Sequence, residues 1–271
     1  MSVAIEWAGE AIELRPERAA LLPRHRTLLV ADVHFGKARA FRRQGVPVPG
    51  GTTRETLARL DALVRATAPE RLVFLGDLLH SRDAQGSAAL EDFARWRAAH
   101  AALALVLVRG NHDRHAGDPP AALGIEVVDE PFALGALALC HHPYARRPAR
   151  VDEAAPVPAG AGPSVRSFMA EAIERADADA STPPTVSRRV RAAAPADADA
   201  DGRPRIAGHE HPCIGLHGRG DSLRLPCFHF GADVAVLPAF GAFTGMHAVR
   251  RTPGDRVWAV VDDRVVEVPA R

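Results

Sequence analysis

Cysteine, long apolar runs and targeting signals are scarce or missing in this sequence, and each scarcity excludes a class of protein. The three cysteines, Cys140, Cys213 and Cys227, are odd in number and form no C-x-x-C pair, which argues against a disulfide-stapled secreted domain and against a closed thiolate zinc site. No apolar run approaches the roughly 18 residues of a membrane span. No basic segment followed by an apolar one opens the chain. We therefore expect a reduced, cytoplasmic protein with no membrane partner.

The sequence also lacks an excess of either charge, because 34 lysines and arginines balance 33 acidic residues and leave a formal net charge of +1. The protein thus lacks the broad basic field of a tight, nonspecific nucleic-acid binder, although local basic patches are compatible with this balance. Lys37 is the only lysine. With 47% hydrophobic residues in 271, the chain is long enough and apolar enough to build a substantial core.

Short apolar runs rich in β-branched residues recur along the first half of the chain and predict buried strands. They lie at 27–31, 71–75, 103–108, 124–128 and 136–140, after a short hairpin at 3–7 and 11–14. Amphipathic segments between them predict helices at 38–44, from a cap at Thr52 or Thr53, and around Leu90, Phe93 and Trp96. This alternation of strands and helices predicts an α/β fold with right-handed crossovers.

The second half of the chain is β-rich, with strands expected at 222–225, 227–230, 234–237, 256–261 and 264–268. Two sheets packed face to face with helices outside would accommodate both halves. Between them, residues 145–203 contain few large apolar side chains, so we expect a mostly disordered insertion with a short helix at 165–175. We predict one domain over 1–271 that tolerates deletion of this insertion.

Order is expected to resume at Arg205 after the insertion, and side chains of metal-ligand type follow five strand ends, the last of them at 205–207. They are Asp32 with His34, Asp77, Asn111 with His112, His141, and His209 with His211. One such pair alone is weak evidence, since a single His is more often a packed or surface residue than a ligand. Repeated placement directly after apolar strands is difficult to explain by packing, because the carboxyl ends of such strands are where α/β proteins gather their chemistry.

The mixture of ligand types indicates the chemistry. Carboxylate, amide oxygen and imidazole suit manganese, iron or zinc, and seven such ligands are too many for one ion. A pair of ions roughly 3.5 to 4 Å apart would share one carboxylate and hold a bridging hydroxide for in-line attack on phosphorus.

The series D-x-H, G-D, G-N-H-D, H and G-H-x-H resembles the signature of calcineurin-like metallophosphoesterases. More closely, five stretches resemble the PdeM family of ligase-associated DNA damage response endonucleases: 32–37, 76–81, 109–113, 225–228 and 238–241. The resemblance implies a four-layer α-β-β-α sandwich of two mixed β-sheets flanked by helices. It also implies two divalent metal ions, manganese first with iron or zinc as alternatives. The implied activity is a phosphodiesterase that cuts single-stranded DNA in repair, in association with a DNA ligase, a helicase and an exonuclease.

The same resemblance assigns the ligands residue by residue. The first metal would be held by Asp32, His34 and His211, the second by Asn111, His141 and His209, and Asp77 would bridge the two ions. His112 would sit beside the scissile phosphate and stabilise or protonate the leaving oxygen. His141 is preferred over His142 because the family's ligand usually lies two residues before such a proline. Asp113 receives no role.

The sequence departs from the superfamily where many of its phosphatases carry Asp-Arg after the G-D motif, since those positions hold His80 and Ser81. Arg82 and Arg114 are candidates to clamp the phosphate instead, and Lys37 and Arg42 belong to a basic segment placed to follow a phosphate backbone. A solvated helix face explains that segment equally well. Two alternative functions stay open: a cyclic-nucleotide or small-molecule phosphodiesterase or phosphomonoesterase, and a non-catalytic module tied together by metals.

Overall fold

The computed structural model describes residues 1–48, 50–144, 202–217 and 222–269. They belong to a compact unit, Met1–Ala145 with Ala193–Arg271. The expected disorder and the expected helix at 165–175 lie outside the described residues. Among the helices that the structure describes, none combines the length and apolar character needed to cross a bilayer.

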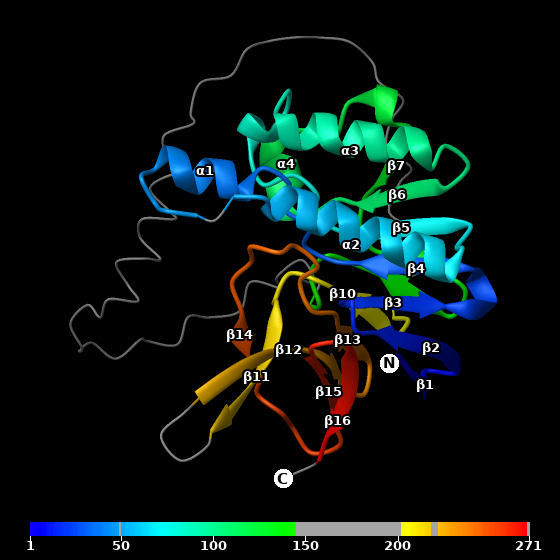
Figure 1. Cartoon of the computed structure of the whole chain (residues 1–271). Coiled ribbons are helices and arrows are strands. Elements are labelled where there is room, and N and C mark those ends of the chain that lie inside the picture. The colour runs from blue at the N-terminus through cyan, green and yellow to red at the C-terminus, as the bar shows by residue number, and fades with distance from the viewer. Residues whose placement is uncertain (49, 145–201, 218–221, 270–271) are drawn as a thin grey trace, which may run out of the picture. The chain divides into compact units, whose positions relative to one another are not determined.

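The first sheet is mixed and has seven strands in sequence order (Figure 1). Its first four strands are antiparallel and its last four run parallel to one another, with β4 common to both sets. The strands are β1 (Val3–Trp7), β2 (Glu10–Arg15), β3 (Ala19–Leu22), β4 (Thr27–Val30), β5 (Arg71–Leu75), β6 (Ala104–Val108) and β7 (Ile125–Val128). The predicted hairpin and the predicted α/β crossovers are confirmed.

Helices α2 (Thr52–Thr67) and α3 (Ala88–Ala99) cover one face of this sheet (Figure 1). Helix α1 (Lys37–Arg43) precedes them, and α4 (Asn111–Ala116) begins inside the G-N-H-D motif, where no helix was expected. The remaining helical turns are η1 (Pro23–His25), η2 (Arg82–Ala84) and η3 (Ala121–Leu123). The expected threonine cap of α2 is wrong: the helix follows Gly51, whose φ is 87°, and no side chain caps it.

Successive residues of the central strands face two different cores, as the pleat of a strand requires. Leu72 and Phe74 of β5 pack with α2 and α3, whereas Val73 and Leu75 pack between the two sheets. All four side chains are fully buried. The unbroken apolar runs in the sequence therefore reflect burial on both faces.

The second sheet is also mixed, which confirms the prediction of two mixed sheets. Its order is β14 (His247–Ala248), β11 (Pro212–His217), β12 (Ser222–Phe230), β13 (Val234–Val236), β10 (Arg205–Ala207), β9 (Leu137–Leu139) and β8 (Phe132–Leu134), with β15 (Arg256–Val261) on β12 and β16 (Arg264–Val268) on β15. The two strands expected at 222–225 and 227–230 are one strand that runs through Pro226. Phe228, Phe230 and Trp258 pack against the first sheet. All α-helices in the described part of the chain precede β7.

Candidate metal centre

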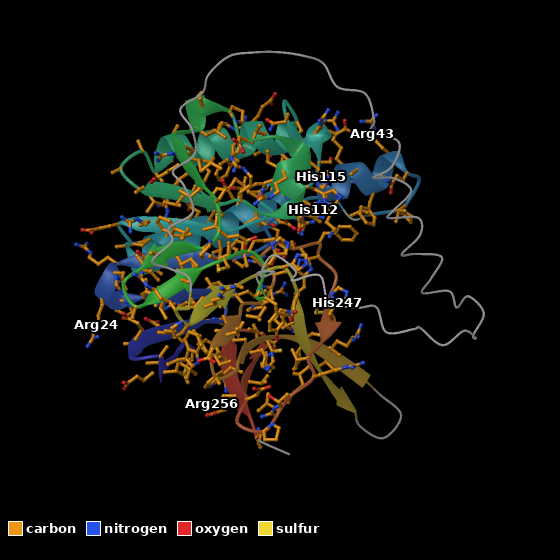
Figure 2. The ribbon with its side chains drawn as sticks, turned by 180° about the vertical axis from the view of Figure 1, so that it is seen from behind. Arg24, Arg43, His112, His115, His247 and Arg256 are labelled. Atoms are coloured by element: carbon orange, nitrogen blue, oxygen red, sulfur yellow. The ribbon has the colours of Figure 1, made fainter. Side chains whose placement is uncertain are left out.

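The seven predicted metal ligands and His112 all follow strands of the two sheets. They come after β4, β5 and β6 of the first sheet and after β9 and β10 of the second. The sheets meet there, since Ala31, next to the first ligand, forms a parallel bridge with Ala239. His112 in the first turn of α4 and His115 in its last turn lie on the side of the unit to which Arg43 of α1 also belongs (Figure 2).

One group of candidate ligands consists of Asp32, His34 and His211, whose ligand atoms all lie within 4.8 Å of one another. His211 Nε2 is 3.5 Å from Asp32 Oδ1, and its Nδ1 lies 3.1 Å from the Gly245 carbonyl. That carbonyl can only accept, so Nδ1 carries the proton and the Nε2 lone pair is free. Asp32 Oδ1 and both ring nitrogens of His34 are buried without a hydrogen-bond partner among the described residues.

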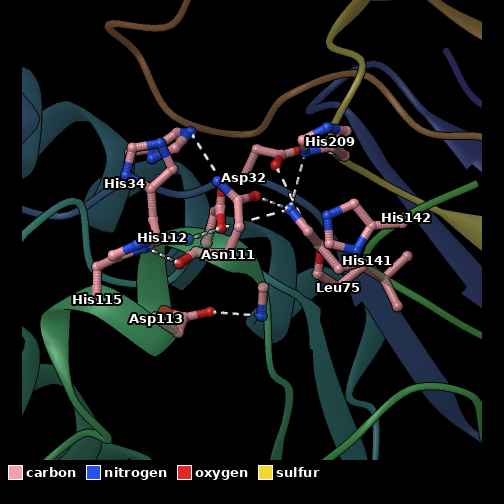
Figure 3. A network of polar contacts seen from close by, with 12 residues as sticks. Asp32, His34, Leu75, Asn111, His112, Asp113, His115, His141, His142 and His209 are labelled. Atoms are coloured by element: carbon pink, nitrogen blue, oxygen red, sulfur yellow. Dashed lines mark hydrogen bonds and ion pairs between the residues drawn. The ribbon is translucent and has the colours of Figure 1, made fainter. Parts of the chain in front are cut away.

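A second group surrounds Nε2 of His141 (Figure 3). Asn111 Oδ1 lies 2.9 Å from this nitrogen, His209 Nδ1 lies 3.1 Å away and Asp77 Oδ1 lies 3.4 Å away. His141 Nδ1 donates to the Leu75 carbonyl at 3.0 Å, which leaves Nε2 as an acceptor.

These separations test whether a cation fits. Two ligands held about 2.1 Å from one ion lie about 3.0 Å apart in an octahedral arrangement and about 3.4 Å apart in a tetrahedral one. The measured range of 2.9 to 3.4 Å matches those edges. A carboxylate, an amide oxygen and imidazole nitrogens brought together in this way are a donor set for a divalent ion.

Asp77 lies between the two groups. Its Oδ1 is 3.4 Å from His141 Nε2, and its Oδ2 is 3.7 Å from His34 Nε2. The side chain is almost completely buried. One oxygen directed to each group is the arrangement a bridging carboxylate needs, and the bridging role stays a prediction.

Burial keeps the imidazoles of His34 and His209 neutral. It lowers the pKa of His34 well below its usual range, with further lowering by the nearby cation Lys37. It lowers the pKa of His209 to about 4, again with help from a neighbour, His141. Burial raises the pKa of Asp77, opposed by His141. Neutral rings retain the lone pairs that bind a metal.

The backbone at the candidate ligands is strained. Five of the seven have positive φ: Asp32 54°, His34 52°, Asp77 51°, His209 70° and His211 47°. Each such non-glycine residue costs of the order of 1–3 kcal/mol and persists only where its surroundings hold it. Here the loops hydrogen-bond to one another, with His34 N donating to the Asp77 carbonyl at 2.8 Å and His209 N donating to Asp32 Oδ2 at 2.9 Å.

Two positions in the motifs require glycine because the side chains of candidate ligands lie too close to the backbone to leave room for a Cβ atom. A Cβ at Gly76, whose φ is 76°, would lie 2.1 Å from His141 Nδ1. A Cβ at Gly110 would lie 2.3 Å from Asp77 Oδ1. Gly110 has a φ of −88°, so its role is this close contact and not the backbone freedom that a turn would need.

His112 is positioned by main-chain atoms. Its Nδ1 donates to the His80 carbonyl at 2.8 Å, and its backbone N–H donates to Asp77 Oδ1 at 3.0 Å. The ring stacks on that of His80, with centroids 4.8 Å apart and 24° between planes. Burial, together with His112, lowers the pKa of His80 to about 3. The residue that replaces the superfamily's Asp thus orients His112 through its carbonyl and its neutral ring.

The structure distinguishes His141 from its neighbour His142. His141 is fully buried among the candidate ligands, whereas His142 Nδ1 lies 2.6 Å from Glu130 Oε1. The other oxygen of Glu130 accepts the backbone N–H groups of both histidines at 2.8 Å. Glu130 therefore aligns the histidine pair, a role that sequence reasoning missed because no motif connects this residue to the site.

Asp113, which had no assigned role, holds two motifs together. Its side chain is fully buried, and its oxygens accept the backbone N–H groups of Leu79 and Gly110, each at 3.0 Å. Burial raises its pKa to about 6, against the hydrogen bond from Leu79. Asp113 stands three positions after the N-cap residue Gly110, which is the spacing of a capping box. The contact was missed because the sequence predicted no helix at this motif.

Three of the four predicted substrate-binding residues contact other parts of the protein. Arg82 Nε donates to the His115 carbonyl at 3.1 Å, and Arg114 lies 3.5 Å from Asp129. Arg42 Nε donates to the Val48 carbonyl at 3.2 Å. Lys37 is beside the site: burial lowers its pKa, while Asp32 and Asp77 raise it. Lys37 thus interacts electrostatically with two of the candidate ligands.

Comparisons with known proteins agree with this geometry. A family model described as calcineurin-like phosphoesterase matches residues 25–153. The crystal structure of a Pseudomonas putida nuclease, MPE, is similar to the chain with 35% sequence identity and a TM-score of 0.71, over 99% of this chain and 100% of that one. No curated protein matches the chain.

Proposed function

The chain belongs to the calcineurin-like phosphoesterases, and from this premise we propose that it is a two-metal phosphodiesterase that cuts single-stranded DNA endonucleolytically. That it is a phosphoric ester hydrolase follows from the family itself. The polynucleotide substrate and the number of ions are the proposal. Similarity over the full chain to a nuclease supports the choice of substrate.

One observation carries the two-metal part of the proposal. The candidate ligands form two groups that share Asp77, with one carboxylate oxygen 3.4 Å from His141 and the other 3.7 Å from His34. The buried, unpaired Asp32 Oδ1 and His34 ring nitrogens would otherwise be costly. Two divalent ions held there would supply charge stabilisation to the phosphoryl oxygens and a nucleophile of lowered pKa.

The chain's own residues divide the remaining work. His112 is held through Nδ1 by the His80 carbonyl, so that its Nε2 is the ring atom available to protonate or stabilise the leaving oxygen. Asp77 aligns the same residue by accepting its backbone N–H. Lys37 adds a fixed positive charge next to Asp32 and Asp77, which favours an anionic substrate.

Diesters are favoured over monoesters by the arrangement of the arginines. A monoester presents a dianion that a monoesterase clamps with a guanidinium. Arg82 and Arg114 are engaged with the His115 carbonyl and Asp129, and Ser81 occupies the usual arginine position. A diester lacks the second charge and does not need that clamp.

The proposal extends to the metal and the cellular role. Manganese suits a donor set of carboxylate, amide oxygen and imidazole, and iron and zinc are the alternatives. The motifs that resemble PdeM support a role in DNA repair, in association with a DNA ligase, a helicase and an exonuclease. Three unpaired thiols support a reducing, cytoplasmic setting.

A substrate panel tests the proposal. Purified protein with manganese should hydrolyse single-stranded DNA with a kcat/KM well above its values for a cyclic nucleotide and for a chromogenic phosphomonoester. The Asp77→Ala protein is the inactive control. A higher kcat/KM for the monoester or the cyclic nucleotide would contradict the proposed substrate while leaving the metal site intact.

A further inference from the structure

A cavity of about 380 Å³ lies between the N-terminal ends of α1, α2 and α3. Its lining includes three arginines from different parts of the chain, Arg39 and Arg42 of α1 and Arg54 of α2, and a single acidic residue, Asp92 of α3. We call it the arginine pocket. None of the seven candidate metal ligands lines it.

The arginine pocket lies next to the metal centre. A smaller cavity of about 20 Å³ is lined by His34 and Lys37 at the centre. It shares Gly36, Ala38, Thr52 and Thr53 with the arginine pocket. The arginine pocket therefore lies directly beside the residues that border the metal centre at Lys37.

Two of the three arginines in the arginine pocket have no acidic partner among the described residues. Arg39 and Arg54 are exposed, and neither makes a side-chain hydrogen bond or an ion pair within the described residues. Asp92, the one acid in the lining, is paired with Arg95. In contrast, Arg43 of the same basic helix is paired with Asp83. Two guanidinium groups from separate helices thus remain available to an anion.

The backbone at the start of α2 also favours an anion in the arginine pocket. The helix α2 has no side-chain cap, so the N–H groups of its first turn have no partner within the helix. Thr52, Thr53 and Arg54, which carry them, line the pocket. Such N–H groups add to the attraction of the arginines for phosphate oxygens.

We infer that the arginine pocket binds a backbone phosphate of the DNA strand that flanks the scissile phosphate. This inference rests on the proposed function, because it requires a polynucleotide substrate. A dinucleotide has no flanking phosphate, and neither does a cyclic nucleotide. The pocket therefore makes the enzyme discriminate by the length of the substrate as well as by its chemistry.

The test compares two double variants with equal loss of charge. The pocket variant is Arg39→Ala with Arg54→Ala. The control is Arg24→Ala with Arg264→Ala, which removes two exposed arginines outside the pocket, and Arg24 lies at the opposite edge of the fold from His112 (Figure 2). Binding to a fluorescent single-stranded oligonucleotide is measured by anisotropy with His112→Ala added to each protein, so that the DNA stays intact.

The pocket variant should bind the oligonucleotide about tenfold more weakly at low salt. The slope of log Kd against log salt should fall by about 0.7 for each phosphate that the variant no longer neutralises. The control variant should have the same Kd and the same salt slope as the protein that carries His112→Ala alone. With His112 restored, the ratio of kcat/KM for the oligonucleotide to that for a dinucleotide should fall about tenfold in the pocket variant only.

The outcomes separate the two proposals. If wild type cuts the oligonucleotide and both double variants bind it with equal affinity and equal salt slope, the pocket inference is overturned and the proposed function stands. An equal loss on oligonucleotide and dinucleotide also overturns it, because the arginines would then act on the site as a whole. If wild type cuts no DNA, the proposed function fails and the inference falls with it.

Discussion

At the scale of single residues, the centre depends on atoms brought closer together than a larger side chain would allow. Gly76 makes this plain, because its Cβ would lie 2.1 Å from His141 Nδ1. The ring of His141 could not then keep its hydrogen bond to the Leu75 carbonyl, now 3.0 Å long. His141 Nε2 lies close to ligand atoms of Asn111, His209 and Asp77. One added methyl group that moves this ring should therefore disturb all the candidate ligands of the second group.

Gly76→Ala is therefore expected to lose about one metal ion per protein and most activity. Gly45→Ala is the matched control: its φ is 79°, close to the 76° of Gly76, but no atom lies within 4 Å of the added Cβ. That control should lose only about 1–2 kcal/mol of stability from the left-handed backbone. Metal analysis and thermal unfolding of both proteins measure these effects. Equal metal content in the two proteins would contradict the proposed role of the close contact between Gly76 and His141.

Asp77 and His112 should separate metal binding from catalysis. Asp77→Ala removes the carboxylate shared by both groups, so it should lower both metal content and activity. His112→Ala should retain its metal while kcat falls about 10²–10⁴-fold, the usual loss for a general acid. Metal analysis beside kinetics gives the comparison. Loss of metal in His112→Ala would mean that this side chain is a ligand.

At the scale of elements, the loops that follow strands are held by side chains that cap backbone groups. Asp255, just before β15, accepts from Thr252 N at 2.7 Å, from Thr252 Oγ1 at 3.0 Å and from His229 Nε2 at 2.9 Å. Burial opposes ionisation, yet the hydrogen bonds from Thr252 and His229 lower the pKa of Asp255 overall. The carboxylate thus joins β12 to the start of β15.

Asp255→Asn should destabilise the protein by about 1 kcal/mol at neutral pH, since a hydrogen-bonded carboxylate is replaced by an amide. The folded pKa lies below the unfolded value of 3.8, so the contribution is complete above that value. It is lost as pH falls through the folded pKa. Urea unfolding of both proteins at neutral and acidic pH measures it. A stability difference that grows towards acid would contradict this assignment.

The elements with the longest patterns could be predicted from the sequence. The strands at β4, β5 and β6 are apolar runs that end at polar residues, and their burial on two faces explains both the pattern and the position of the ligands. In contrast, several strands have three residues or fewer, too few to show a period: β8, β9, β10, β13 and β14. Of these, β9 and β13 were expected because their apolar runs, 136–140 and 234–237, continue beyond the strand, whereas β8 and β14 were not expected.

The candidate site was predictable where side chains themselves carry the chemistry. Asp32, His34 and Asp77 follow parallel strands, and parallel strands end at one edge of a sheet. Glu130 was missed because it acts on the backbone of His141 and His142, far from any motif. The contact between His112 and the His80 carbonyl was missed for the same reason, since a main-chain acceptor leaves no trace in the sequence.

At the scale of the whole molecule, the two sheets explain why the centre is assembled only on folding. The first sheet supplies Asp32, His34, Asp77 and Asn111, and the second supplies His141, His209 and His211. Their shared core lies between Val73 and Leu75 on one side and Phe228 and Trp258 on the other. Metal that binds the folded state should therefore raise the stability of both sheets together.

We propose that this assembled centre cuts within a DNA strand. This is tested by incubating closed circular single-stranded DNA with the protein and manganese, because a circle offers no end to an exonuclease. Wild type should convert the circles to linear DNA and then to shorter fragments, and Asp77→Ala should leave them intact. Circles that stay intact with wild type, while the same preparation hydrolyses a phosphomonoester, would contradict this proposal.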